Sequence, residues 1–117
     1  MRVIIAGSRD ITSYAAVQFA VKDSGFNITE VVSGGARGVD RLGERYAEDN
    51  NIPIQLFLPD WNRDGIGAGF IRNTQMAAYA DALIAIWDGV SKGTKHMIKT
   101  MERENKKVFV YTRYQYF

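Results

Sequence analysis

The segment from Ser33 to Asp40, which reads Ser-Gly-Gly-Ala-Arg-Gly-Val-Asp, constrains this chain most strongly. It follows an apolar run over residues 28–32 and opens a helical pattern over residues 39–50. A glycine-rich turn that leads from a strand into a helix gathers backbone N–H groups, and the helix start adds unpaired donors and partial positive charge. The segment therefore predicts a phosphate site. The alternative interpretation is a tight turn with a helix cap.

Several residues of this segment are candidate ligands of the predicted phosphate. Glycine adopts positive φ and carries no side chain that would hold an anion away. Arginine adds a bidentate fork to the same anion. The residues that we predict to contribute are Ser33, Gly34, Gly35, Arg37 and Gly38.

Short apolar runs and helical patterns alternate along the whole chain. The predicted strands cover residues 3–6, 28–32, 54–58, 82–87 and 107–111. The predicted helices cover residues 13–24, 39–50, 70–80 and 94–105, and a polar loop covers residues 59–69. This alternation is typical of right-handed βαβ units and a parallel sheet covered on both faces. We predict one domain over residues 1–117, an α/β Rossmann-like three-layer sandwich with a five-stranded parallel sheet in the order 3-2-1-4-5.

Composition excludes several kinds of site. The chain has no cysteine and one histidine, so disulfides, thiolate nucleophiles and a multi-histidine metal site within one chain are excluded. We expect no metal and no cofactor.

No signal peptide or membrane-spanning run is present, so we expect a cytoplasmic protein without a membrane partner. The formal net charge is +2, with the basic excess late in the chain. A solvated helix face would give the same count, so nucleic-acid binding remains an alternative.

Four loops follow strands at the carboxyl edge of the predicted sheet, namely residues 7–12, 33–38, 59–69 and 88–93. Ligands of such sheets bind beyond the carboxyl ends of the strands, at the switch point beside the first strand. Most of the unusual residues of the chain lie in these loops. We therefore predict a single site at this edge.

The first loop begins with Gly7, Ser8, Arg9 and Asp10. Gly7 allows a sharp turn, while Ser8 offers a hydroxyl and Arg9 a cation to the shared pocket. The alternative interpretation is a turn in which Asp10 pairs with Arg9. The spacing differs from the G-x-G-x-x-G fingerprint, which argues against a standard NAD-dependent dehydrogenase.

Asp40 lies in the first turn of the second predicted helix, where a carboxylate interacts favourably with the helix dipole. We expect Asp40 to cap the helix, to hold a ribose hydroxyl or to orient Arg37.

The third loop carries Asp60 and Trp61. The tryptophan either stacks on a base or packs the loop against the domain. Residues 65–69 form a second anion cradle or a flexible lid.

Two further segments complete the predicted site. Arg72 and Asn73 lie in the first turn of a helix, where a cation is unfavourable to the dipole. A phosphate or the carboxylate of Asp60 would retain Arg72 there. Gly93 and Thr94 open the last predicted helix and offer backbone N–H groups and a hydroxyl to phosphate oxygens. The order of residues is not that of a Walker motif.

Taken together, these motifs resemble the SLOG superfamily, which includes the DNA-processing protein DprA and the Lonely-Guy phosphoribohydrolases. The segments that carry the resemblance are residues 33–40, 6–9, 70–73 and 93–94, in the same order along the chain. The small stand-alone branch related to YspA and YpsA, often found in bacteria and phages, is similar over nearly the whole chain. The resemblance implies a Rossmann-like fold with a nucleotide site, in which residues 34–38 belong to the phosphate and ribose pocket.

The resemblance also implies roles for single residues. Arg72 corresponds to the arginine that Lonely-Guy enzymes place at the reacting nucleotide, which makes it the candidate catalytic residue. Those enzymes carry a glutamate soon after the threonine, whereas Met97 stands at the corresponding place here. Asp40, Asp60 and Asp88 are the carboxylates that could substitute for it.

The sequence therefore favours binding of a nucleotide or a nucleotide-derived small molecule, for sensing, sequestration or processing. The alternatives are a Lonely-Guy-like hydrolase that cleaves the N-glycosidic bond of a nucleoside monophosphate or ADP-ribose derivative, and DprA-like binding of single-stranded DNA. Members of the superfamily commonly form dimers, so we expect a homo-oligomer. The aromatic tail, residues 111–117, contributes to that contact or covers the sheet edge.

Overall fold

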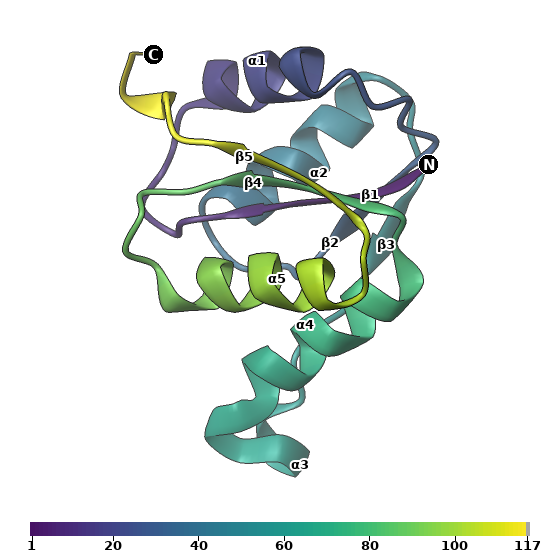
Figure 1. The fold of residues 1–117 in the computed structure, drawn as a ribbon, viewed down its shortest axis with the longest axis vertical. Coiled ribbons are helices and arrows are strands. Elements are labelled where there is room, and N and C mark those ends of the chain that lie inside the picture. Colours follow the sequence, from purple (N-terminus) through teal and green to yellow (C-terminus); the bar gives the residue numbers. More distant parts are fainter. Residues whose placement is uncertain (117) are drawn as a thin grey trace.

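The computed structural model describes residues 1–116 and confirms the predicted sheet (Figure 1). Five parallel strands are hydrogen-bonded in the order β3-β2-β1-β4-β5. The strands are β1 (Arg2–Gly7), β2 (Glu30–Ser33), β3 (Ile54–Leu56), β4 (Ala82–Ile86) and β5 (Lys107–Tyr111). The helices are α1 (Tyr14–Ser24), α2 (Val39–Asp49), α3 (Trp61–Asp64), α4 (Ala68–Tyr79) and α5 (Lys92–Arg103), with short 3-10 helices η1 (Gly65–Gly67) and η2 (Tyr114–Tyr116).

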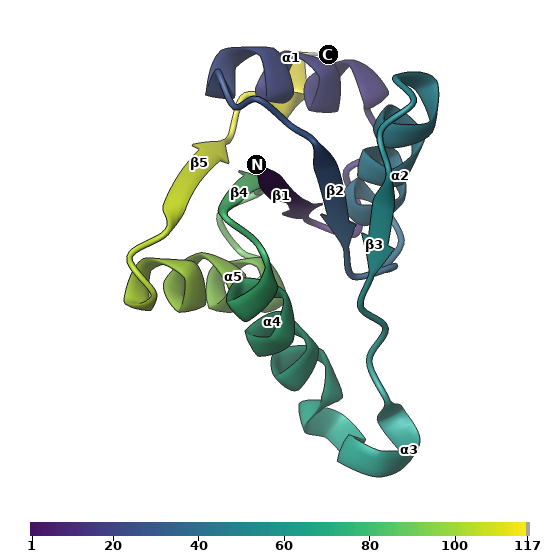
Figure 2. The same cartoon turned by 90° about the vertical axis from the view of Figure 1, so that its right-hand side faces the viewer.

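Helices cover both faces of the sheet, as Figures 1 and 2 show: α1 and α2 lie on one face, and α4 and α5 on the other. Successive side chains of a strand point to opposite faces, so an apolar run is expected in a strand that is buried on both sides. In β1, Val3 and Ile5 belong to the core beneath α1 and α2, while Ile4 and Ala6 belong to the core beneath α4 and α5. The central strands are thereby fixed between two apolar layers, and their carboxyl ends form a rigid edge.

Local hydrogen bonds and a glycine set the ends of α1. The Oγ atom of Ser13 accepts a hydrogen bond from the N–H of Ala16 (3.2 Å) and caps the helix start. Gly25 ends the helix with φ of 70°, in the left-handed conformation that glycine adopts without a Cβ clash.

The predicted loop over residues 59–69 is more ordered than expected, because it contains α3 and η1. Asp60 starts α3 by accepting a hydrogen bond from the N–H of Arg63 (3.0 Å). Strand β3 ends at Leu56, two residues before the predicted end, and α4 starts at Ala68. Figure 2 shows that this part of the chain projects from the sheet. We call residues 57–71 the arm.

The end of the chain packs toward the sheet in the part that the structure describes. Tyr111 is buried, and Tyr114 packs against the core beneath α1 and α2. These two residues therefore favour the interpretation in which the tail covers the sheet. Phe117 lies outside the described residues.

Within residues 1–116, no helix combines the length and the apolar character that a membrane crossing requires.

Candidate functional site

Two adjoining cavities lie at the carboxyl edge of the sheet, beneath the arm. The outer cavity has a volume of about 440 Å³ and is lined by Arg9, Gly34, Gly35, Ala36, Arg37, Leu58, Pro59, Trp61 and Arg72. The inner cavity has a volume of about 70 Å³ and is lined by Ala6, Gly7, Arg9, Ala36, Asp40, Arg72, Asn73, Met76, Ser91, Gly93 and Thr94. Arg9, Ala36 and Arg72 line both. The glycine-rich loop and the start of α5, which are far apart in the sequence, therefore lie at one site.

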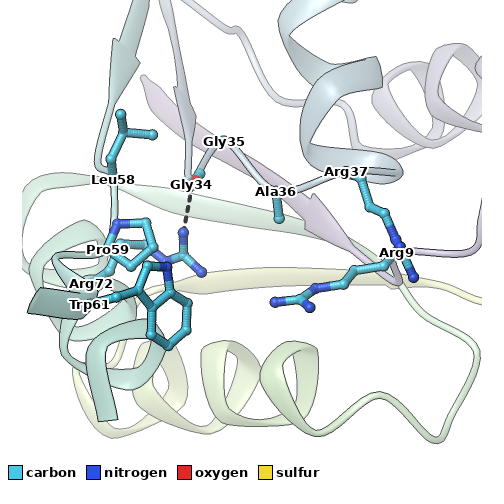
Figure 3. A pocket seen from close by; sticks show the side chains of 9 residues that line it. All are labelled: Arg9, Gly34, Gly35, Ala36, Arg37, Leu58, Pro59, Trp61 and Arg72. Carbon is cyan, nitrogen blue, oxygen red and sulfur yellow. Dashed lines mark hydrogen bonds between the residues drawn. The ribbon is translucent and has the colours of Figure 1, made fainter. Parts of the chain in front are cut away.

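The outer cavity is positively charged. Three arginines line it, and none of its described lining residues is acidic. Figure 3 shows Trp61 and Arg72 on one side, with the guanidinium of Arg9 extending toward them from the other side. Such an arrangement attracts an anion and presents an aromatic face beside it.

Asp10 pairs with Arg37, at 3.5 Å between Nη2 and Oδ1, and both side chains are exposed. This differs from the sequence-based alternative in which Asp10 pairs with Arg9. The reason is geometric, because the side chain of Arg9 extends into the cavity instead (Figure 3). An exposed ion pair contributes little free energy, so Arg37 remains available to a ligand.

Arg72 is held by the glycine-rich loop and by its own neighbour. Its Nη1 atom donates to the carbonyl oxygen of Gly34 (2.5 Å), and its Nε atom donates to Oδ1 of Asn73 (3.0 Å). Burial lowers the pKa of Arg72, and the nearby carboxylate of Asp40 opposes that shift. The predicted partner Asp60 instead caps α3. A guanidinium has five N–H donors, so the two bonds leave donors for a ligand.

Asn73 joins α4 to the start of α5. Its side chain is buried, and its Nδ2 atom donates to the carbonyl oxygen of Gly93 (3.2 Å). The same Nδ2 atom lies 3.2 Å from Nδ1 of His96, whose ring stacks on Phe70 with 4.1 Å between centroids. Since its amide is engaged by Arg72, Gly93 and His96, Asn73 positions other groups of the site.

The glycine-rich loop uses some of its N–H groups internally. The N–H of Gly35 donates to Oγ of Ser33 (3.1 Å), and the N–H of Ala36 donates to Oδ2 of Asp40 (3.1 Å). The expectation that the whole loop forms an anion cradle is therefore not met at these two residues in this conformation. The short polar side chains at either end of the loop reach these N–H groups, which the glycine pattern alone does not reveal.

Asp40 is a buried carboxylate that lines the inner cavity. Its exposed fraction is 5%, and burial raises its pKa from 3.8 to about 6, against the lowering effects of the Ala36 N–H and the Arg72 charge. Helix α2 starts after Gly38, and among the described residues no side chain caps it. Asp40 thus accepts a hydrogen bond from an N–H group of the loop rather than from one at the start of α2.

Within residues 1–116, no three His, Asp or Glu side chains gather as metal ligands.

The start of α5 opens toward the inner cavity. Among the described residues, no side chain caps its first N–H groups. The hydroxyl of Thr94 lies 3.2 Å from that of Ser91, and a Cβ placed on Gly93 would meet no atom within 4 Å. The protein's own packing therefore does not require glycine at position 93. A helix start with free N–H donors and an adjacent hydroxyl can donate to an anion or to the oxygen of a ligand hydroxyl.

Four predicted site residues line neither cavity: Ser8, Ser33, Gly38 and Asp60. Ser8 is buried and its Oγ atom accepts from the N–H of Asp88 (3.1 Å). Gly38 has φ of 77°, and a Cβ there would lie 2.4 Å from the carbonyl oxygen of Arg9. Ser8 and Gly38 thus hold neighbouring loops together, whereas Ser33 bonds to Gly35 and Glu44 and Asp60 caps α3.

Leu58, Pro59 and Ser91 line the site although the sequence analysis did not select them. Leu58 and Pro59 follow β3 at the same edge as the other loops, and Ser91 precedes α5. Their place after a strand or before a helix was therefore a usable signal. Leu58 and Pro59 have no polar side-chain group that would have drawn attention, whereas Ser91 has a hydroxyl that the sequence analysis overlooked.

Comparison with known proteins assigns the chain to a family: it belongs to the YspA, cpYpsA-related SLOG family (YAcAr), whose profile matches residues 1–63. It is 36% identical over 112 residues to the Gene 61 protein of Mycobacterium phage D29, covering 87% of this chain and 89% of that protein. The fold is similar to that of DNA processing protein A (DprA) from Streptococcus pneumoniae, with a TM-score of 0.75 and 18% identity. That match covers 93% of this chain and 49% of DprA, so the chain spans about half of that protein. The predicted superfamily and fold are confirmed.

Proposed function

We propose that this SLOG-family protein binds a nucleotide or a nucleotide-derived small molecule in the two adjoining cavities. Family membership and the DprA-like fold support a function related to nucleotides or DNA in general. The observation that carries the narrower proposal is the position of Arg72 beside Trp61 in one cavity. Together they offer a cation to a phosphate and an aromatic face to a base.

The dimensions and exposure of the site suit such a ligand. A volume of about 440 Å³ lies within the range of small-molecule sites. Trp61 is 53% exposed and lines the outer cavity, so part of its indole is accessible to a ligand. Arg9 faces the same space from the opposite wall (Figure 3). We therefore place the phosphate between Arg9 and Arg72 and the base over Trp61.

Calorimetric titration of AMP, GMP, CMP, UMP and ADP-ribose into the wild type tests this proposal. Arg72→Ala is the informative variant, and Arg45→Ala is its control because it removes the same charge. Arg45 pairs with Asp49 at 3.6 Å, lies over the Tyr14 ring and lines neither cavity. We expect at least one ligand to bind, Arg72→Ala to weaken its affinity at least about tenfold, and Arg45→Ala to preserve it. Equal losses in both variants, or no binding by the wild type, would contradict the proposal.

Hydrolysis of an N-glycosidic bond is a second candidate function. Met97, at the place of the Lonely-Guy glutamate, is buried in the core beneath α4 and α5. Asp60 caps α3, and Asp88 accepts from the N–H groups that follow it. Among the described residues, Asp40 is the one carboxylate that lines either cavity, and it lies beside Arg72. Free base released by the wild type but not by Asp40→Asn would support this function.

Binding of single-stranded DNA is a third candidate, favoured by the likeness to a DNA processing protein and by the three arginines of the outer cavity. Contacts with several phosphates release counterions, so affinity for an oligonucleotide would fall steeply with salt. Titrating oligo-dT and a mononucleotide at two salt concentrations separates the two cases. A steep salt dependence together with no affinity for the mononucleotide favours DNA.

A further inference from the structure

Asp40 places a negative charge where the rest of the site is positive. It lines the inner cavity, and Gly93 and Thr94 at the start of α5 line the same cavity. The charged groups that act on it are Arg72 of α4, which attracts its charge, and Glu44 one turn later in α2, which repels it. The N–H of Ala36 donates to its Oδ2 atom, and the N–H of Gly7 also stabilises its charged form.

A second negative charge beside this carboxylate would be unfavourable. Burial already disfavours the charged form of Asp40, as its pKa of about 6 indicates, and an adjacent phosphate would disfavour it further. A neutral hydrogen-bond donor would instead form a charge-assisted bond with it. The ligand group that faces Asp40 is therefore a donor without negative charge, while the phosphate stays with the arginines of the outer cavity.

The size of the inner cavity narrows the choice of donor. Its volume of about 70 Å³ is far smaller than the 440 Å³ of the outer cavity, so the bulky base is better accommodated in the outer cavity and a small polar part of the ligand in the inner one. Ser91 and Thr94, which also line the cavity, add hydroxyls that exchange hydrogen bonds with a diol.

We propose that Asp40 accepts a hydrogen bond from a ribose hydroxyl of the bound nucleotide, so that the site selects ribonucleotides over nucleotides that lack the ribose diol. This inference rests on the proposed nucleotide binding. An analogue without the hydroxyl leaves the buried carboxylate without a donor from the ligand, although the N–H of Ala36 still donates to it, and sites built around such a ligand bond reject the analogue strongly.

The experiment compares AMP, 2′-deoxy-AMP, 3′-deoxy-AMP and 2′,3′-dideoxy-AMP by calorimetry at pH 7.5, where Asp40 is ionised. We expect the wild type to bind AMP at least about tenfold more tightly than the dideoxy analogue. In Asp40→Asn the preference should shrink to less than about threefold, because a neutral amide accepts a weaker hydrogen bond. Glu48→Gln is the control, since Glu48 is exposed on α2 and lines neither cavity; it should keep the preference.

Each other result overturns the inference in an identifiable way. Equal affinity of the wild type for AMP and the dideoxy analogue overturns it and leaves nucleotide binding intact. A preference that persists in Asp40→Asn and in a second variant, Asp40→Ser, assigns the selectivity to another residue. Weaker binding of IMP than of AMP, without any effect of the diol, identifies a base amino group as the donor. Absence of binding by any nucleotide removes the proposed function as well.

Discussion

The Nη1 atom of Arg72 lies 2.5 Å from the carbonyl oxygen of Gly34, which joins the first turns of α4 to the loop after β2. Position 34 permits this contact because it has no side chain. A Cβ there would lie 2.5 Å from Nη1 and 2.8 Å from Cζ of Arg72, and 3.0 Å from Oδ2 of Asp40. The glycine-rich loop thus positions a cation and a carboxylate, in addition to any direct contact with a ligand.

Gly34→Ala should displace Arg72 and weaken nucleotide affinity at least about tenfold, with the fold retained. The added methyl group meets the mobile end of a side chain, which can move into the cavity. Calorimetric titration measures the affinity, and circular dichroism checks the fold. Gly67→Ala is the control, because a Cβ there meets no atom within 4 Å. Unchanged affinity in Gly34→Ala would show that ligand binding does not depend on this placement of Arg72.

Gly93→Ala should separate stability from binding. A Cβ at position 93 meets no protein atom within 4 Å, and alanine favours helix more than glycine, so the free energy of unfolding should rise by about 0.5 kcal/mol. The same methyl group would obstruct a ligand at the start of α5. We therefore expect a higher denaturation midpoint together with weaker nucleotide affinity. Higher stability with unchanged affinity would place the ligand away from α5.

Asn73→Ala should lower both stability and affinity. The change removes the bonds to Nε of Arg72 and to the carbonyl oxygen of Gly93, so the free energy of unfolding should fall by about 1–3 kcal/mol. Arg72 would lose one of its two fixed contacts, and affinity should fall with it. Urea denaturation and ligand titration measure the two effects. Thr74→Ala is the control, since Thr74 is exposed and bonds within α4 to Phe70; a comparable loss there would argue against a special role for Asn73.

Asp40 should make stability depend on pH. Its pKa is raised from 3.8 to about 6, so the folded protein holds this proton more tightly than the unfolded chain. The stabilising contribution is fully present below pH 3.8 and is lost as pH rises through about 6. Relative to Asp40→Asn, the free energy of unfolding of the wild type should fall by about 2 kcal/mol between pH 4 and pH 7. Denaturation curves across that range check this, and a difference that stays constant would contradict it.

Trp61→Ala should weaken affinity through loss of stacking. Stacking of a base on an aromatic side chain contributes about 1–3 kcal/mol, so affinity should fall by roughly 5- to 150-fold. Ile66→Ala is the control on the same arm, because Ile66 is 103% exposed and lines neither cavity. Quenching of tryptophan fluorescence by the ligand in the wild type provides a second readout. Similar affinities in both variants would place the base elsewhere.

The sequence predicts the sheet and the edge at which the two cavities lie, because both follow from simple patterns. Wholly apolar runs such as Val3 to Ala6 mark buried parallel strands, and their alternation with helices indicates a parallel sheet covered on both faces. The rule that ligands bind at the carboxyl edge then brings Arg9, Arg72 and Gly93 to one place. These results do not depend on any single side-chain conformation.

What the sequence could not predict depends on short polar contacts. Ser33 and Asp40 take the N–H groups of Gly35 and Ala36, and a glycine pattern does not indicate which way those groups point. The sequence predicts a loop over residues 59–69, because α3 is a single turn started by Asp60, with no apolar periodicity to indicate a helix. Individual hydrogen bonds determine where such N–H groups point and where a short helix starts, and residue types alone do not predict those bonds.

The most direct test of the central claim is a crystal structure of the wild type with bound AMP. The account predicts phosphate oxygens within hydrogen-bond distance of the guanidinium groups of Arg9 and Arg72, with the base over Trp61. A nucleotide bound elsewhere on the surface, or a phosphate remote from Arg72, would contradict the account.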